Sequence, residues 1–195
     1  IYFKNIMTFS SGGCFHENCP IWINPEQKLT ASKLKPNMTI IDYEGNETFI
    51  KIVTRKKCID GSAPMSIISE DICLTPYHPI CIPDKNDKKK WYFPINIEGA
   101  ENIMCDYYYN FVLDNRGSLM CGMDKLEVCT LGHGQQGPVL GHRFYGCGDE
   151  NDPEGVVCQL NSLFPNHEGE IDLTNTVEIR DPTNGNRVIG LHRLD

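Results

Sequence analysis

The chain has 195 residues and a formal net charge of −8, which argues against a nucleic-acid or anionic-membrane partner because phosphate contacts need a basic face. With 40% hydrophobic and 23% charged residues, it has the composition of a globular protein with its own core. No segment approaches the ~20 apolar residues of a membrane span, and the first residues lack the pattern of a signal peptide.

Strand and turn patterns dominate the first two thirds of the chain. The only short helical candidate is 28–37, which ends at Pro36. Residues 38–56 hold two runs of β-branched residues around a turn, which predicts a hairpin. Residues 66–83 predict a second strand pair, broken by a proline-containing corner, and residues 106–122 predict a third with "DNRG" as its turn.

The composition changes after the segment 130–142, where glycine and polar residues dominate, and this predicts a boundary near 133 to 140. Residues 170–194 then predict two further strands around "DPTNGN". We therefore expect an all-β domain over 14–133, followed by a smaller β-rich C-terminal extension over 134–195.

Ten cysteines raise two structural interpretations, disulfides and zinc. Disulfide frameworks are typical of smaller secreted domains. "CLTPYHPIC" offers Cys73, His78 and Cys81, but the chain has no C-x-x-C pair to complete a zinc site. We expect most of the thiols to be small buried residues in a reducing, cytoplasmic compartment, and we expect no metal or cofactor.

The stretch "SSGGCF" contains a junction with chemical meaning. Gly13 has no side chain to shield its carbonyl from the thiol of Cys14. Attack through a five-membered ring would convert the peptide bond into a thioester, an N-to-S acyl shift that intramolecularity favours with effective molarities of ~10⁵ M or more. A thiol with an ordinary pKa of about 8.5 is mostly protonated at neutral pH. The departing nitrogen also needs a proton, so the reaction requires a partner group.

Of the six histidines, only His78 lies in a motif with a mechanical interpretation, the T-x-x-H of "LTPYHPI". The two prolines limit the freedom of this corner, so Thr75 and His78 can be held at a fixed separation. His78 would protonate the nitrogen of Cys14, and Thr75 would bond the backbone or the ring. The alternative is a buried histidine that serves only the core.

Taken together, "GCF", the "TPYHP" corner, the aromatic strand "YNFVLD" and the ending "TLGHG" resemble the Hint superfamily of inteins, bacterial intein-like domains and hedgehog autoprocessing domains. "TLGHG" with the later "GHRFYGC" and "RDPTNGNRVIGL" is most similar to the Vint subgroup. The resemblance implies a Hint-type pseudo-twofold β horseshoe. It also implies that Cys14 is the nucleophile, assisted by Thr75 and His78, and that Gly13 carries the scissile carbonyl.

Further positions follow from the same resemblance. Asn110 falls where many inteins have an aspartate, and because it is no base we give it a supporting role. Cys129 matches a cysteine of hedgehog-type domains and would relay the acyl group or serve redox control, with a simple buried residue as the alternative. His133 and His142 lie in a glycine-rich loop and would either form a metal site or approach Cys14 as neighbours of the site. Asp114 is expected to be a solvated turn residue.

Two departures from the family pattern restrict the expected activity. The closing segment ends in His133–Gly134 without the terminal asparagine of a splicing intein, so full splicing is not expected. The extension has no apolar helical stretch for a sterol acceptor, which disfavours hedgehog-type transfer. What remains is single-turnover cleavage of the upstream flank, residues 1–13, with transfer to water, a thiol or an amine. The substrate would be the protein's own upstream polypeptide. The alternative is a catalytically silent binding or structural module.

Overall fold

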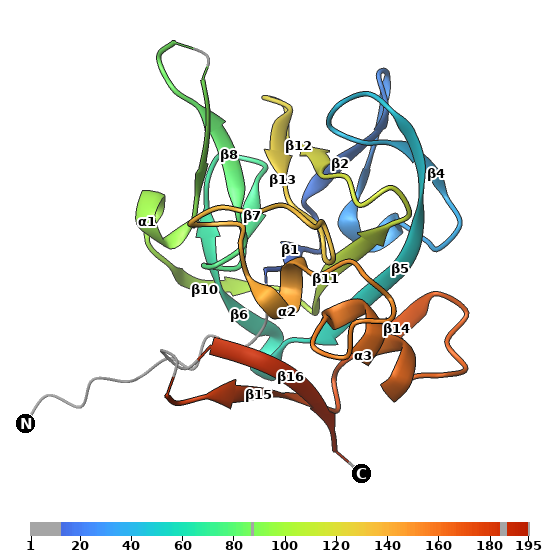
Figure 1. Cartoon of the computed structure of the whole chain (residues 1–195). Helices are drawn as coiled ribbons and strands as arrows, with labels where there is room; N and C mark the ends of the chain where they lie inside the picture. Colours follow the sequence, from blue (N-terminus) through green and yellow to red (C-terminus); the bar gives the residue numbers. More distant parts are fainter. Residues whose placement is uncertain (1–12, 87, 184–186, 195) are drawn as a thin grey trace, which may run out of the picture.

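The computed structural model describes residues 13–86, 88–183 and 187–194. Its strands form two larger sheets and one C-terminal hairpin, and its helices are short (Figure 1). The structure therefore confirms the all-β expectation. Within the described ranges, no helix has both the length and the apolarity to cross a membrane.

The larger sheet has eight strands and carries the start of the described chain at its centre. Its order is β10 (Glu101–Met104), β6 (Ser62–Ile67), β7 (Cys73–Leu74), β1 (Phe15–His16), β11 (Tyr107–Leu113), β5 (Glu47–Lys57) and β14 (Glu170–Asp172), with β4 (Thr39–Ile41) also paired to β5. The β4–β5 pairing confirms the hairpin predicted within 38–56. Two-residue β1 is antiparallel to both β7 and β11, so it is held on both sides.

The second sheet has six strands. Its order is β3 (Gln27–Thr30), β2 (Pro20–Asn24), β12 (Leu119–Cys121), β13 (Leu126–Val128), β8 (Ile80–Pro83) and β9 (Lys89–Tyr92). Fully buried side chains from both sheets form the main core, for example Phe15 and Phe111 from the first and Ile21 and Ile80 from the second. This shared core fixes β1 against the rest of the domain.

The hairpin predicted within 106–122 is wrong, because β11 and β12 belong to different sheets. The "DNRG" segment is a turn, but its contacts lead elsewhere. Asn115 donates from Nδ2 to Oδ2 of buried Asp42 over 2.7 Å. Asp42 also accepts the backbone N–H of Asn46 at 2.8 Å. The turn is thus tied to the β4–β5 loop, and the chain crosses from one sheet to the other.

The strand pair predicted within 66–83 needs a similar correction. β7 pairs with β6 and β1, whereas β8 pairs with β13 and β9 in the second sheet. The corner between β7 and β8 contains Pro76 and Pro79, which have no N–H for a strand ladder. It therefore bends the chain out of one sheet and into the other.

The helical candidate at 28–37 yields only one turn of 3-10 helix, η1 (Ala31–Lys33). The other short helices, which the sequence did not predict, are η2 (Ile59–Gly61), α1 (Ile95–Glu98), α2 (Arg143–Gly146) and α3 (Val156–Leu163). In α3, the buried residues Val156, Val157 and Leu160 lie on one face. The helix has only eight residues, so it is too short to give the pattern of a long amphipathic helix.

The C-terminal region, 134–195, contains α2, α3, β14 and the hairpin of β15 (Thr176–Asp181) with β16 (Arg187–Arg193), which confirms the two strands predicted within 170–194 (Figure 1). β14 lies parallel to β5. A second core joins Ile52 of β5 and Val112 of β11 to Leu160, Ile171 and Val188. The region is therefore packed on the same sheet that carries β1.

This packing predicts a stability difference between two isoleucines. Ile171 is 2% exposed in the second core, whereas Ile179 on β15 is 45% exposed. Ile171→Ala should lower the free energy of unfolding in urea by about 2–5 kcal/mol, because it removes buried methyl groups and leaves a cavity. Ile179→Ala is the matched control and should cost less than about 1 kcal/mol. Equal losses for the two variants would contradict the packing role of β14.

Candidate active site

The backbone of Cys14 is bonded on both sides by one residue, Thr75. The N–H of Cys14 donates to Oγ1 of Thr75 over 2.7 Å, and the N–H of Thr75 donates to the carbonyl oxygen of Cys14 over 2.9 Å. Thr75 directly follows β7 and begins the proline corner, where its own carbonyl accepts the N–H of His78 at 3.0 Å. The T-x-x-H spacing thus places its two specified residues beside Cys14.

Gly13 fits against His78 only because it has no side chain. A Cβ atom on Gly13 would lie 2.3 Å from Cγ of His78 and 2.4 Å from its Cα, far closer than unbonded carbons can approach. The requirement for glycine here comes from this close approach to the histidine.

Asn110 in β11 donates from Nδ2 to the carbonyl oxygen of Gly13. Its other side-chain atom, Oδ1, accepts the backbone N–H of Phe111 at 2.8 Å. An N–H group can only donate, so this second bond fixes which side-chain atom of Asn110 is oxygen and which is nitrogen. The amide N–H₂ is thereby directed at the Gly13 carbonyl.

His78 is held in one tautomer by a backbone carbonyl. Its Nε2 lies 2.7 Å from the carbonyl oxygen of Cys129; a carbonyl only accepts, so Nε2 carries the hydrogen. Nδ1 then carries the lone pair, and it is buried without a well-formed hydrogen bond. The ring of Phe15 packs edge-on at a centroid distance of 4.5 Å and restrains the imidazole.

Burial keeps His78 neutral. It lowers the pKa from the ordinary 6.5 to about 4, although the backbones of Cys129 and Cys14 act in the opposite direction. His133 behaves alike: burial first, and then the proximity of His78, lower its pKa to about 4. The site therefore holds two uncharged imidazoles at neutral pH.

Cys129 contributes its carbonyl, and its thiol is buried, which raises the thiol pKa. His133 accepts the N–H of Gln135 on Nδ1 at 3.0 Å, and its ring faces Gly146 with Cε1 3.4 Å from where a Cβ would stand. His142 instead begins α2, where Nδ1 accepts the N–H of Tyr145 at 3.3 Å.

The fold gives no geometric support to the zinc-site interpretation of the cysteines. Cys73 lies in β7 and Cys81 in β8, which belong to different sheets. In the described part of the chain, no three His, Cys, Asp or Glu side chains gather in a way that would hold a metal ion.

Asp114 is exposed in the turn after β11, as expected for a solvated turn residue.

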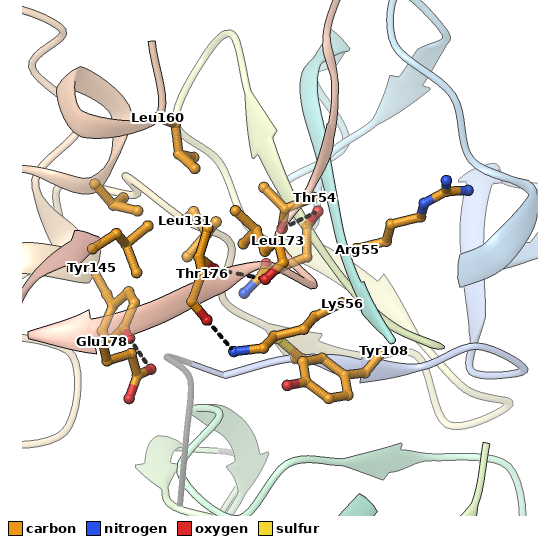
Figure 2. Close-up of a pocket in the computed structure, with 14 residues that line it drawn as sticks. Thr54, Arg55, Lys56, Tyr108, Leu131, Tyr145, Leu160, Leu173, Thr176 and Glu178 are labelled. Atoms are coloured by element: carbon orange, nitrogen blue, oxygen red, sulfur yellow. Dashed lines mark hydrogen bonds between the residues drawn. The ribbon is translucent and has the colours of Figure 1, made fainter. Parts of the chain in front are cut away.

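A cavity of about 40 Å³ lies beside Cys14 and Asn110, with room for a few water molecules at most (Figure 2). The C-terminal region supplies much of its wall, including Leu160, Leu173 and Leu191. Leu160 and Leu173 lie outside the sequence motifs, whereas Leu191 ends the "RDPTNGNRVIGL" segment. Only the tertiary packing of α3, β14 and the hairpin brings them to the cysteine.

Two polar pairs line the same cavity. Lys56 donates from Nζ to the carbonyl oxygen of Thr176 over 2.9 Å, and Tyr145 donates from its hydroxyl to Glu178 over 2.5 Å. Figure 2 shows both pairs bridging separate elements. They were not predicted, because each joins residues that are more than thirty positions apart.

The chain is similar to a known protein family and to several solved structures. The family model described as Vint, Hint-domain, matches residues 13–190. Structural similarity extends to the gp41-1 intein, with 12% identity, coverage of 62% of this chain and 100% of that chain, and a TM-score of 0.41. A bacterial intein-like domain from Clostridium thermocellum shares 14% identity, with coverage of 62% and 100% and a TM-score of 0.45. A DnaB intein from Synechocystis sp. PCC 6803 shares 11%, with coverage of 61% and 99% and a TM-score of 0.40. No curated protein matches the chain.

The protein is thus a Hint domain of the intein-like class. More narrowly, because the family model spans most of the chain, it belongs to the Vint family. This confirms the family resemblance seen in the motifs, and the arrangement around Gly13 and Cys14 is consistent with autoprocessing.

The buried imidazoles predict how stability depends on pH. His78 has a folded pKa of about 4 against an ordinary 6.5, so unfolding takes up a proton between these values. The free energy of unfolding should fall as the pH drops through this window, by about 3 kcal/mol for His78, and its contribution should level off below pH about 4.

Urea denaturation across this pH range measures the effect. The His78→Gln variant should show a smaller slope of stability against pH, while His192→Gln, at an exposed position, should keep the wild-type slope. An unchanged slope in His78→Gln would contradict the buried neutral state.

Proposed function

We propose that this domain breaks its own Gly13–Cys14 peptide bond by an N-to-S acyl shift, in a single turnover. The observation that carries the proposal is the set of contacts on that one peptide. Asn110 donates to its carbonyl oxygen, Thr75 accepts from its nitrogen, and His78 packs directly on Gly13. If Thr75 and His78 only stabilised the core, their contacts with the peptide bond before Cys14 would not be expected.

In the proposed reaction, Sγ of Cys14 attacks the carbonyl carbon of Gly13, and the thiol proton passes to Nδ1 of His78. That atom is able to accept it because burial keeps the imidazole neutral. Negative charge develops on the carbonyl oxygen, where the Asn110 N–H₂ group is already placed. Such a preformed donor stabilises the tetrahedral state without reorganisation.

The C–N bond then breaks as His78 returns the proton to the nitrogen of Cys14. The products are a thioester between Gly13 and Sγ and a free α-amino group on Cys14. Water, a thiol or an amine then attacks the thioester carbon and releases the upstream segment. The closing segment 129–134 has no asparagine to cyclise, so we propose N-terminal cleavage without splicing.

The first test is a fusion with a foreign domain upstream of residue 1, incubated with and without dithiothreitol or hydroxylamine and analysed by mass spectrometry. Either nucleophile should release a fragment that ends at Gly13, and Cys14→Ala should abolish the release. His78→Ala should slow it by roughly 10²–10⁴, the range for a general acid–base group. The exposed-site variant His192→Ala should cleave at the wild-type rate. A precursor that stays intact under every condition would instead support a catalytically silent module.

A second test separates the role of Asn110 from general stability. Asn110→Ala should slow hydroxylamine-induced cleavage by roughly 10²–10³, the cost of losing one donor to a developing oxyanion. Asn102→Ala is the matched control, because Asn102 is exposed in β10, and it should leave the rate unchanged. A wild-type rate in folded Asn110→Ala would remove Asn110 from the mechanism.

A further inference from the structure

Two cysteines outside the proposed mechanism lie in sulfur–sulfur contact close to the nucleophile. The Sγ atoms of Cys58 and Cys105 are 2.7 Å apart, a short movement from the ~2.05 Å of a disulfide bond. The two side chains share one buried cluster with Cys14. None of the ten cysteines, all within the described ranges, is paired in a disulfide in the structure.

The backbone on both sides forces this contact. Cys58 follows β5, and its N–H donates to the carbonyl of Asp106 over 2.8 Å; Cys105 follows β10, and its N–H donates to the carbonyl of Gly61 over 3.0 Å. The β5–β11 ladder runs up to Lys57 and Tyr107, and the β6–β10 ladder ends at Ser62 and Met104. The two connections are therefore held side by side where these ladders meet.

The pair is buried but is flanked in the sequence by exposed side chains. Cys58 and Cys105 are themselves only 5% and 4% exposed, but the adjacent Ile59 and Met104 are 83% and 75% exposed. Burial raises the pKa of both thiols, so they are mostly protonated at neutral pH and react slowly with oxidants. The short distance between the two Sγ atoms, rather than a high reactivity of either thiol, therefore favours a disulfide between Cys58 and Cys105.

We propose that Cys58 and Cys105 are a disulfide-forming pair whose oxidation leaves the Cys14 thiol in its reduced state. Two thiols lose two electrons and two protons to an oxidant, such as an azodicarboxamide, which becomes the hydrazine, and one S–S bond forms. If only one of the two cysteines were present, its thiol would be left beside Cys14 and would capture the nucleophile on oxidation. This protective role rests on the proposed acyl shift, whereas the pairing itself does not.

The pairing is tested on the upstream fusion by treatment with diamide, alkylation of the remaining thiols and peptide mapping by mass spectrometry. We expect a Cys58–Cys105 peptide that has lost two hydrogens, with Cys14 alkylated. This readout needs no cleavage, so it decides the pairing even if the domain proves to be silent. Alkylated Cys58 and Cys105 after diamide, or a Cys14 disulfide to either one, would overturn the proposal.

The protective role is tested by hydroxylamine-induced cleavage, because hydroxylamine does not reduce disulfides. Diamide should leave the wild-type rate unchanged and should abolish cleavage by Cys58→Ser, with a Cys14–Cys105 peptide and recovery under reductant. The double variant Cys58→Ser/Cys105→Ser should be insensitive to diamide. Cys158→Ser, which removes a thiol from α3, is the matched control and should behave as wild type.

Untreated Cys58→Ser should cleave at the wild-type rate, which establishes that it is folded. If diamide then leaves its Cys14 free and its cleavage intact, the protective role is wrong.

Discussion

The close packing of Gly13 on His78 is the constraint on which the site depends. No other residue fits against the imidazole at position 13, since a Cβ atom would lie 2.3 Å from Cγ of the histidine. The fold places this contact by holding the two-residue strand β1 between β7 and β11. Thr75 then bonds Cys14 in both directions, so that the peptide before the cysteine has one fixed position.

Burial of the His78 imidazole lowers stability at acidic pH and also keeps the ring neutral at neutral pH. His78 and His133 are both buried and neutral, and a buried imidazole costs stability as soon as it must ionise. In the proposed reaction, the same burial leaves a lone pair on Nδ1 at neutral pH, while the Cys129 carbonyl holds the hydrogen on Nε2. The main chain of Cys129 therefore matters more to this site than its thiol.

The C-terminal region adds to the site by closing it. β14 extends the sheet alongside β5, and leucines of α3, β16 and the segment after β14 wall the cavity beside Cys14. The cavity beside Cys14 has a volume of about 40 Å³, which is enough for only a few water molecules. In the proposed reaction, this wall would limit the size of the acceptor that can reach the thioester. In the proposed redox role, a Cys58–Cys105 disulfide would prevent either thiol from forming a disulfide with Cys14 on oxidation.

The strands of the β4–β5 and β15–β16 hairpins and the Hint resemblance could be predicted from the sequence, because alternation, turn residues and the T-x-x-H spacing are local patterns. The same local motifs contain Cys14, Thr75, His78 and Asn110. Tertiary packing alone separates β11 and β12 into different sheets and brings α3 and the hairpin to the cavity beside Cys14. It alone placed the Cys58 and Cys105 sulfurs together. These features depend on contacts between residues far apart in the chain, such as Asn115 with Asp42 and Lys56 with Thr176, and no short-range pattern encodes such contacts.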